Sequence, residues 1–264
     1  EIMLSTYICH PSMANNEISG PVVLTYLAKW LLDNKERKYS YRIIFIPETI
    51  GSITYLSYNY KKLRKNVIAG YNVTCIGDDR TYSYLPSRSG NTISDKVAKH
   101  VLKNIFPKYK SYDWSERGSD ERQYCAPGID LPIASIMRSK YGSYPEYHTS
   151  LDDLKSVVTE KGLEGGYNAL RLALDIFEKN KKYRINTLGE PQLGKRKLYP
   201  TLSTINTKNQ VKLMMNLLTW CDGKHTLLDI AEKLKLPIWQ LYEISEKLQK
   251  KKVIKQVRLT YRNE

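Results

Sequence analysis

Short apolar runs alternate with longer amphipathic stretches along the first 183 residues. The run YRIIFI at 41–46 is rich in β-branched residues and is typical of a strand buried on both faces of a parallel sheet. Similar runs predict further strands at 2–9, 67–76 and 132–137. Apolar positions at helical spacing predict helices at 21–33, 51–59, 94–104 and 159–179. This alternation predicts an α/β domain with a mainly parallel sheet covered by helices on both faces.

The pattern changes after residue 183. A stretch of turn formers and charged residues without periodicity predicts a linker at 184–210. It is followed by short helical patterns and a β-rich tail, at 211–221, 226–234, 238–251 and 253–259. Three short helices and a terminal hairpin are the outline of a winged helix. We therefore expect an α/β domain at 1–183 and a winged-helix domain at 211–264.

The composition is that of a folded protein in a reducing compartment. The chain is 41% hydrophobic and 26% charged, and it contains no apolar run long enough to cross a membrane. No pair of cysteines has CxxC spacing, which disfavours a zinc site built from thiolates and predicts reduced cysteines in a cytoplasmic protein; the four are Cys9, Cys75, Cys125 and Cys221. Because Glu1 leads straight into an apolar run, we expect sequence to precede it.

The basic excess lies in the last third of the chain. Residues 184–264 hold 16 of the 42 Lys and Arg residues but 7 of the 27 Asp and Glu residues. This suggests either an anionic partner or solubility. DNA binding through the helix at 238–251 is disfavoured, because Glu243 and Glu246 on that helix would repel phosphates. Contact with another protein, or with a second copy in a homo-oligomer, is the alternative.

Candidate chemistry gathers in the loops that follow the predicted strands, where open α/β sheets carry their sites. Two of the four histidines, His10 and His148, lie in such loops beside carboxylates. Imidazole and carboxylate together suit a catalytic zinc with an open position. Glu48, at the end of another strand, could take a proton from a metal-bound water. Its alternative role is a carboxylate at a helix N-terminus.

Five segments in fixed order resemble the zinc-dependent aminopeptidases that share a fold with glutaminyl cyclases. They are His10, Asn16-Glu17-Ile18-Ser19-Gly20, Glu48-Thr49-Ile50-Gly51, Ser119-Asp120-Glu121 with the Gly-Ile segment at 128–129, and His148-Thr149. Within that superfamily the chain is most similar to bacterial aminopeptidase-like proteins encoded among surface-polysaccharide genes, which carry an inserted domain and end in a winged helix. The resemblance implies zinc and a hydrolase fold.

The chain departs from this family at metal positions. Asn16, Thr49 and Thr74 are neutral where the family pattern has carboxylates. A neutral amide such as that of Asn16 is at best a weak ligand, so we expect one zinc ion rather than two. By the resemblance, the ligands would be His10, His148 and one carboxylate, either Glu17 or Asp78, although Asp78 could equally belong to a turn.

The same resemblance assigns the remaining roles. Glu48 would be the general base, and three residues would bind the substrate or orient the site: Asp120, Glu121 and Arg122. The alternative for Asp120 is a helix cap. Asp152 and Asp153 are read as a cap for the following helix. The expected activity is zinc-dependent hydrolysis of an amide bond next to a free amine, on a small peptide or an amino-sugar-like substrate. A catalytically impaired scaffold and a ligand-sensing transcription regulator are the alternatives.

Overall fold

The computed structural model describes residues 1–198, 205–259 and 261, of which 205–208 are described by their backbone alone. The chain divides into two compact units, residues 1–178 and 179–264. No helix among the described residues is long and apolar enough to cross a membrane.

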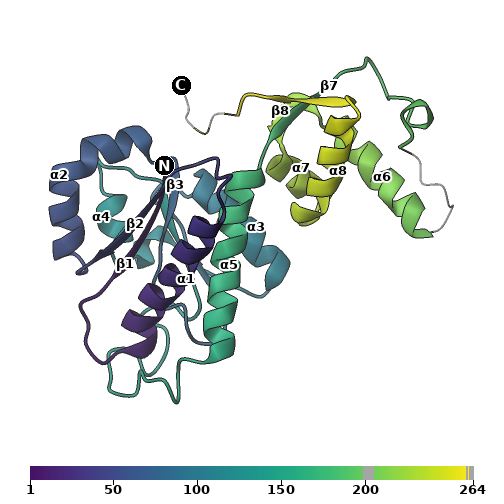
Figure 1. Cartoon of the computed structure of the whole chain (residues 1–264). Coiled ribbons are helices and arrows are strands. Elements are labelled where there is room, and N and C mark those ends of the chain that lie inside the picture. Colours follow the sequence, from purple (N-terminus) through teal and green to yellow (C-terminus); the bar gives the residue numbers. More distant parts are fainter. Residues whose placement is uncertain (199–204, 260, 262–264) are drawn as a thin grey trace. The chain divides into compact units, whose positions relative to one another are not determined.

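A six-stranded sheet forms the centre of the first unit (Figure 1). Its strand order is β2-β1-β3-β6-β4-β5, and every neighbouring pair is parallel except β4 with β6. The strands are β1 (Ile2–Tyr7), β2 (Tyr41–Ile46), β3 (Ala69–Asn72), β4 (Ser83–Leu85), β5 (Lys110–Ser111) and β6 (Ile133–Met137). The mainly parallel sheet predicted from the sequence is confirmed. The short strands β4 and β5 were not predicted, because two or three residues carry no periodicity.

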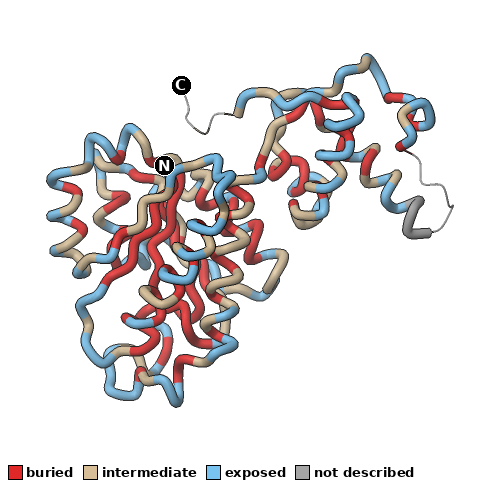
Figure 2. The backbone as a smooth tube through the Cα atoms, in the orientation of Figure 1, coloured by how far each residue is buried: buried red, intermediate tan, exposed pale blue. Residues whose placement is uncertain are grey.

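Helices cover this sheet on both faces. Helices α1 (Ser19–Asp33) and α5 (Glu160–Lys179) lie on one face (Figure 1). On the other, α2 (Ile50–Asn66) and α4 (Glu121–Tyr124) enclose an apolar cluster that includes Met3, Leu56, Leu63, Tyr124 and Ile133. Helix α3 (Ile93–Ile105), which begins with a Thr92–Asp95 capping box, packs against β3, β4 and β6. Strands β1, β3 and β6 are buried along their whole length, as Figure 2 shows, whereas the edge strand β2 is half-buried.

The sheet ends are held close to the helices by glycine. A Cβ on Gly20, at the start of α1, would lie 2.4 Å from Thr6 Oγ1 and 2.5 Å from Val73 O. A Cβ on Gly162, in α5, would lie 2.0 Å from Gly77 O. Both helices can therefore approach the carboxyl ends of β1 and β3 only because these positions lack side chains. This packing fixes the loops in which the candidate site residues lie.

The second unit is a three-stranded antiparallel sheet with helices, which confirms the predicted winged helix. Its elements are β7 (Lys182–Ile185), α6 (Ile205–Thr219), β8 (Asp222–Thr226), α7 (Leu227–Leu234), α8 (Trp239–Lys250) and β9 (Ile254–Val257), and a short 3₁₀ turn at Gly194–Arg196 precedes α6.

The expected domain limits differ from those of the structure. Strand β7 lies at the boundary between the expected α/β domain and the expected linker, yet it is the central strand of the sheet, between β8 and β9. The tail at 253–259 was expected to form a terminal hairpin, but β9 pairs with β7 instead. Strand β7 could not be predicted from local periodicity, because it is only four residues long and follows α5 almost directly. Part of the expected linker, 199–204, lies outside the described residues.

Candidate metal centre

Three of the predicted site residues come together at the carboxyl ends of β1 and β2. The Nδ1 atom of His10 lies 3.2 Å from Glu17 Oε2, and its Nε2 atom lies 3.7 Å from Glu48 Oε2. His10 follows β1, and Glu17 lies in a π-helical turn at Ala14–Ile18 that leads into α1. Glu48 lies between β2 and α2. One imidazole is thus flanked by two carboxylates from different segments.

His148 approaches the same place from a distant loop. The centroids of the His10 and His148 rings are 5.4 Å apart, and the His148 ring stacks on Tyr147 at 3.9 Å. Two site residues have positive φ angles, 57° at His148 and 61° at Thr49. Non-glycine residues rarely adopt such angles outside constrained segments. The convergence of the two imidazoles, predicted from the sequence, is present in the structure.

Cys9 also belongs to this group, although the spacing of the cysteines disfavours a zinc site built from thiolates. Its Sγ atom lies 3.3 Å from His10 Nδ1 and accepts a hydrogen bond from the backbone N–H of Glu48, at 3.1 Å. Partial desolvation of the sulfur, with Glu17 and Glu48 nearby, raises the pKa of the Cys9 thiol. Spacing between cysteines could not reveal it. The available signal was its position beside His10 at the end of a strand.

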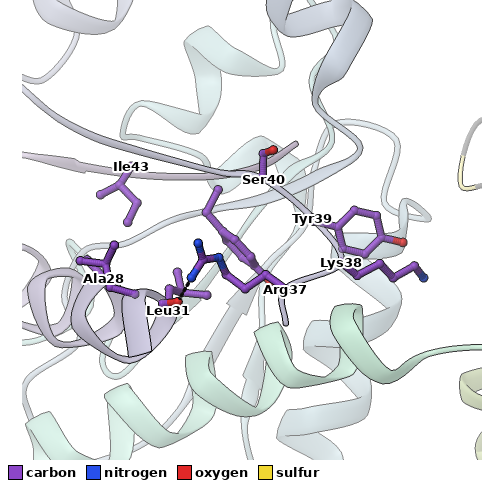
Figure 3. Close-up of a pocket in the computed structure, with 9 residues that line it drawn as sticks. Ala28, Leu31, Arg37, Lys38, Tyr39, Ser40 and Ile43 are labelled. Atoms are coloured by element: carbon purple, nitrogen blue, oxygen red, sulfur yellow. Dashed lines mark hydrogen bonds between the residues drawn. The ribbon is translucent and has the colours of Figure 1, made fainter. Parts of the chain in front are cut away.

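An open cavity of about 610 Å³ borders this group. Its lining residues are Ile8, Cys9, His10, Pro11, Ser12, Glu17, Ile18 and Pro21. A second cavity, of about 540 Å³, lies by the amino end of β2, at the opposite end of that strand (Figure 3). No carboxylate or imidazole lines that second cavity, and its Arg37 donates hydrogen bonds to Leu31 O and Asn34 O at the end of α1. The candidate chemistry therefore lies in the first cavity.

Asp78 does not take the ligand role that the resemblance suggested. Its side chain is fully buried, and both oxygens accept hydrogen bonds: Oδ1 from Ser139 Oγ and the backbone N–H of Arg80, and Oδ2 from Asn15 Nδ2 and the backbone N–H of Ser139. Among the described residues, the His, Cys and carboxylate atoms that lie within 4.8 Å of one another belong to Cys9, His10 and Glu17. Of the two carboxylates that were considered, Glu17 is therefore the one in place.

Asn16 lies in a neutral hydrogen-bonded group behind the site. The Tyr7 hydroxyl donates to Asn16 Oδ1 at 2.7 Å and lies 2.6 Å from Thr74 Oγ1. Thr74 in turn donates to the backbone oxygen of Asn16 at 3.1 Å. All three side chains are buried, and burial raises the pKa of Tyr7 well above its usual value. Asn16 is thereby committed to neutral partners and does not join the group around His10.

Asp120 anchors the loop that carries Glu48. Its Oδ1 accepts hydrogen bonds from the Thr49 N–H at 2.8 Å and from Ser52 Oγ at 2.7 Å, whereas Oδ2 is buried without a hydrogen-bond partner. Burial raises the pKa of Asp120 to about 6; the two hydrogen bonds oppose the rise, and Glu48 adds to it. Asp120 thus positions the start of α2, which is compatible with the orienting role expected of it.

Glu121 and Arg122 have different surroundings. Glu121 is fully buried, and its oxygens accept from the N–H groups of Gly118 and Ser119, from Tyr141 Oη and from Asn72 Nδ2. Glu121 therefore holds its own loop, and its full burial disfavours direct contact with a substrate. Arg122 is exposed and donates to Thr49 Oγ1 at 2.8 Å, next to Glu48, so it stays a candidate for substrate contact.

Asp152 also differs from its prediction as a cap for the following helix. Its oxygens accept from the N–H groups of Asn15 and Asn16, at 2.7 and 3.0 Å, so it caps the turn before α1 instead. Tyr144 donates to it as well, at 2.9 Å. Asp153 accepts from the N–H groups of Lys155 and Ser156 and so caps a local turn. Asp152 therefore ties the loop after His148 to the segment that carries Glu17.

Comparison with known proteins agrees with this architecture. A family model described as a domain of unknown function, DUF4910, matches residues 1–180, and a winged helix-turn-helix model matches residues 181–256. The chain belongs to the DUF4910 family. A curated relative from Clostridium acetobutylicum, named for polysaccharide biosynthesis and an aminopeptidase-like domain, is 43% identical over 235 residues. That alignment covers 88% of this chain and 53% of the relative.

Solved structures extend the comparison to the fold. The DUF4910 chain matches a crystal structure of a Clostridium acetobutylicum protein described as a peptidase, with a TM-score of 0.88 and 38% identity over 97% of this chain and 57% of that one. A zinc aminopeptidase from Bacillus subtilis matches with a TM-score of 0.53 and 18% identity, covering 66% of this chain and 45% of the other. The first unit therefore has an aminopeptidase-like fold. The chain spans about half the length of these relatives.

The DUF4910 residues fit one zinc ion but not two. For one ion, Glu17 Oε1 is buried and has no hydrogen-bond partner among the described residues, and its carboxylate lies in a group with an imidazole and a thiol. These are donors that zinc prefers. For a second ion, carboxylates would be needed at Asn16, Thr49 and Thr74, where the chain has an amide and two hydroxyls already engaged in hydrogen bonds.

Proposed function

We propose that this chain is a one-metal, zinc-dependent hydrolase that cleaves an amide bond next to a free amine. The observation that carries the proposal is the position of His10 between Glu17 and Glu48 at the carboxyl ends of β1 and β2. A bound zinc would act there as a Lewis acid and lower the pKa of water. His10 and Glu17 would hold it, with His148 close enough to assist.

The protein's own groups supply the rest of the chemistry. The carboxylate of Glu48 is partly exposed, at 19%, and faces the imidazole from the side opposite Glu17, so it can accept a proton from a water in the cavity and return it to the leaving amine. Asp120 fixes Glu48 indirectly through the N–H of Thr49. Arg122, beside Thr49, can meet an anionic group on the substrate.

The name of a relative and the charges at the site support a proposal for the substrate class. The Clostridium acetobutylicum relative is named for polysaccharide biosynthesis. Glu17 lines the open cavity, and Glu48 lies 3.7 Å from His10, which also lines it; these carboxylates favour a cationic amine. We therefore propose a small aminoacyl compound, either a short peptide or an aminoacylated amino sugar, as the substrate of a cytoplasmic enzyme. The winged helix would contact protein, a second copy included, rather than nucleic acid.

Zinc content and hydrolysis together test the proposal. The chain is stripped of metal, dialysed against zinc, and assayed with aminoacyl-nitroanilides, aminoacyl-glucosamine and their N-acetylated forms. We expect one zinc per chain and cleavage only of the substrates with a free amine. His10→Ala should abolish both, whereas His225→Ala should not, although His225 also lies beside a carboxylate, 2.9 Å from Asp222 in the second unit. A chain that takes up no zinc would overturn the proposal.

A second candidate function is supported by the neutral group of Tyr7, Asn16 and Thr74. Loss of acidic residues at these positions suits a scaffold that keeps the aminopeptidase-like fold without its chemistry. Such a scaffold would bind zinc weakly or not at all and would contact partners through the winged helix. Stoichiometric zinc without cleavage of any free-amine substrate would favour it over the hydrolase.

A further inference from the structure

Cys9 is unlike the other cysteines of the chain. Cys75, Cys125 and Cys221 are buried, whereas Cys9 is exposed and lines the cavity that holds the candidate site. The proposed hydrolysis does not use its sulfur. A thiol in this position, beside an imidazole and a carboxylate, calls for a separate explanation.

The distances around His10 match those between ligands of one tetrahedral ion. With usual zinc–nitrogen, zinc–oxygen and zinc–sulfur bond lengths, neighbouring ligand atoms stand about 3.3–3.6 Å apart. His10 Nδ1 lies 3.3 Å from Cys9 Sγ and 3.2 Å from Glu17 Oε2. All three donor atoms lie within 4.8 Å of one another. The same imidazole nitrogen is thus the neighbour of both other donors.

Glu17 gives independent evidence that a ligand belongs here. The residue is 7% exposed, and its Oε1 atom is buried without a hydrogen-bond partner in the described part of the chain. Native proteins leave few buried polar atoms unsatisfied, and a bound ion is one of the accepted reasons for such an atom. Oε2 of the same carboxylate is within reach of His10. A cation held between these groups would satisfy the carboxylate.

Charge balance indicates why a thiol would be recruited. The neutral residues Asn16, Thr49 and Thr74 leave Glu17 as the single anion in direct contact with His10 Nδ1. A thiolate at Cys9 supplies a second anion, which neutralises a divalent cation. The N–H of Glu48 already points at the sulfur, at 3.1 Å, and would stabilise its charge.

We propose that Cys9 Sγ, His10 Nδ1 and Glu17 form a three-ligand site for a borderline-soft divalent cation such as Zn²⁺, with one coordination position open. The assignment rests on the proposed function and names the ligands of its metal. Binding replaces the S–H bond of Cys9 with a metal–sulfur bond and releases the proton to solvent. The thiolate makes the site prefer Zn²⁺, Cd²⁺ and Co²⁺ over Mg²⁺ and Ca²⁺.

Alkylation of the thiol tests this ligand set without any enzymatic readout. The metal-free chain is treated with iodoacetamide under native conditions, and each cysteine is followed by peptide mass spectrometry. We expect Cys9 to react fastest, and saturating Zn²⁺ to slow its alkylation at least tenfold while Mg²⁺ leaves it unchanged. In His10→Ala, zinc should no longer protect the thiol, and the matched variant His225→Ala should behave as the parent.

The absorption spectrum of the Co²⁺-loaded chain separates ligation from shielding. A sulfur-to-cobalt charge-transfer band in the near ultraviolet is expected in the parent chain and in Cys221→Ser, and it should be absent in Cys9→Ser. Zinc binding without protection of Cys9, or cobalt binding without this band, overturns the ligand assignment and leaves the hydrolase proposal standing. Protection and the band together with no hydrolysis overturn the hydrolase and leave the ligands standing. Failure to bind either metal overturns both.

Discussion

Two neighbouring groups at the carboxyl edge of the sheet differ sharply in charge. Around His10 the segments after β1 and β2 bring together two carboxylates, Glu17 and Glu48. Behind it, Tyr7, Asn16 and Thr74 exchange hydrogen bonds between neutral atoms only. The charged group has an oxygen of Glu17 without a partner, while the oxygens of Asn16 are satisfied. The first group is therefore suited to a ligand, and the second to holding the fold.

The contrast shows how one fold can keep part of a metal centre. Asn16 and Glu17 are adjacent in the same π-helical turn, yet the Asn16 side chain accepts a hydrogen bond from the buried Tyr7, whereas Glu17 lines the cavity. A helical turn places neighbouring side chains on different faces, so substitution at one position leaves the other undisturbed.

The largest effect is expected for Glu48→Gln, which tests whether the charged group performs chemistry. If Glu48 is the general base, hydrolysis should fall by about 10²- to 10⁴-fold. Zinc content should stay at one per chain, because replacing the carboxylate of Glu48 with its amide isostere alters no proposed ligand. Turnover rate and bound zinc are measured together, with the exposed Glu36→Gln as the matched control. Loss of zinc along with turnover would instead assign Glu48 to holding the His10 ring.

Asn16→Asp places a charge in the neutral group of Tyr7, Asn16 and Thr74. Asn16 is 1% exposed, and its Nδ2 faces Met13 Sδ at 3.6 Å, so a carboxylate there would meet sulfur in place of a counter-charge. Burying an unpaired charge should lower the free energy of unfolding at neutral pH by about 3 kcal/mol. Urea denaturation measures this, with the exposed Asn91→Asp as control. An unchanged stability would mean that a cation or water already compensates this position.

How far the sequence anticipates the structure depends on the range of the interactions. The mainly parallel sheet, its flanking helices and the winged helix follow from local periodicity. The meeting of His10 and His148 follows from their places after strands together with the ordered motifs. Between Glu17 and Asp78 the sequence could not choose, because the choice depends on Ser139, which satisfies Asp78 from a distant segment.

Other parts of the site carry no local signal. The capping of the segment before α1 by Asp152 joins residues more than 130 positions apart. The role of Cys9 escapes any rule based on cysteine spacing, because its neighbours are an imidazole and a carboxylate. Strand β7 could not be separated from the expected linker, since its partners β8 and β9 lie far along the chain. The catalytic and ligand roles themselves stay predictions.

The stability that Asp120 contributes should depend on pH, because this buried carboxyl group holds the loop that carries Glu48. Burial raises its pKa to about 6, so the folded chain binds the proton more tightly than the unfolded chain does. Stability should therefore increase, relative to Asp120→Asn, as pH falls from 7 through 6 toward 4, by on the order of 2 kcal/mol. Parallel urea titrations of both chains measure this difference, and the exposed Asp79→Asn serves as control. A difference that does not change with pH would place the raised pKa elsewhere.

The smallest effect on the metal-free fold is expected for Glu17→Gln, and this small effect completes the comparison. Glu17 is a buried carboxylate with one unsatisfied oxygen, and burial raises its pKa, so its ionised form contributes little to folding. Gln keeps the shape and removes the charge, and should change the free energy of unfolding by less than about 1 kcal/mol. Zinc, by contrast, should raise the melting temperature of the parent and of the exposed control Glu164→Gln, but not of Glu17→Gln. If Glu17→Gln lowers the free energy of unfolding as much as Asn16→Asp does, Glu17 stabilises the fold as Asn16 does. The distinction between a metal-binding group around His10 and a structural group around Asn16 would then fail.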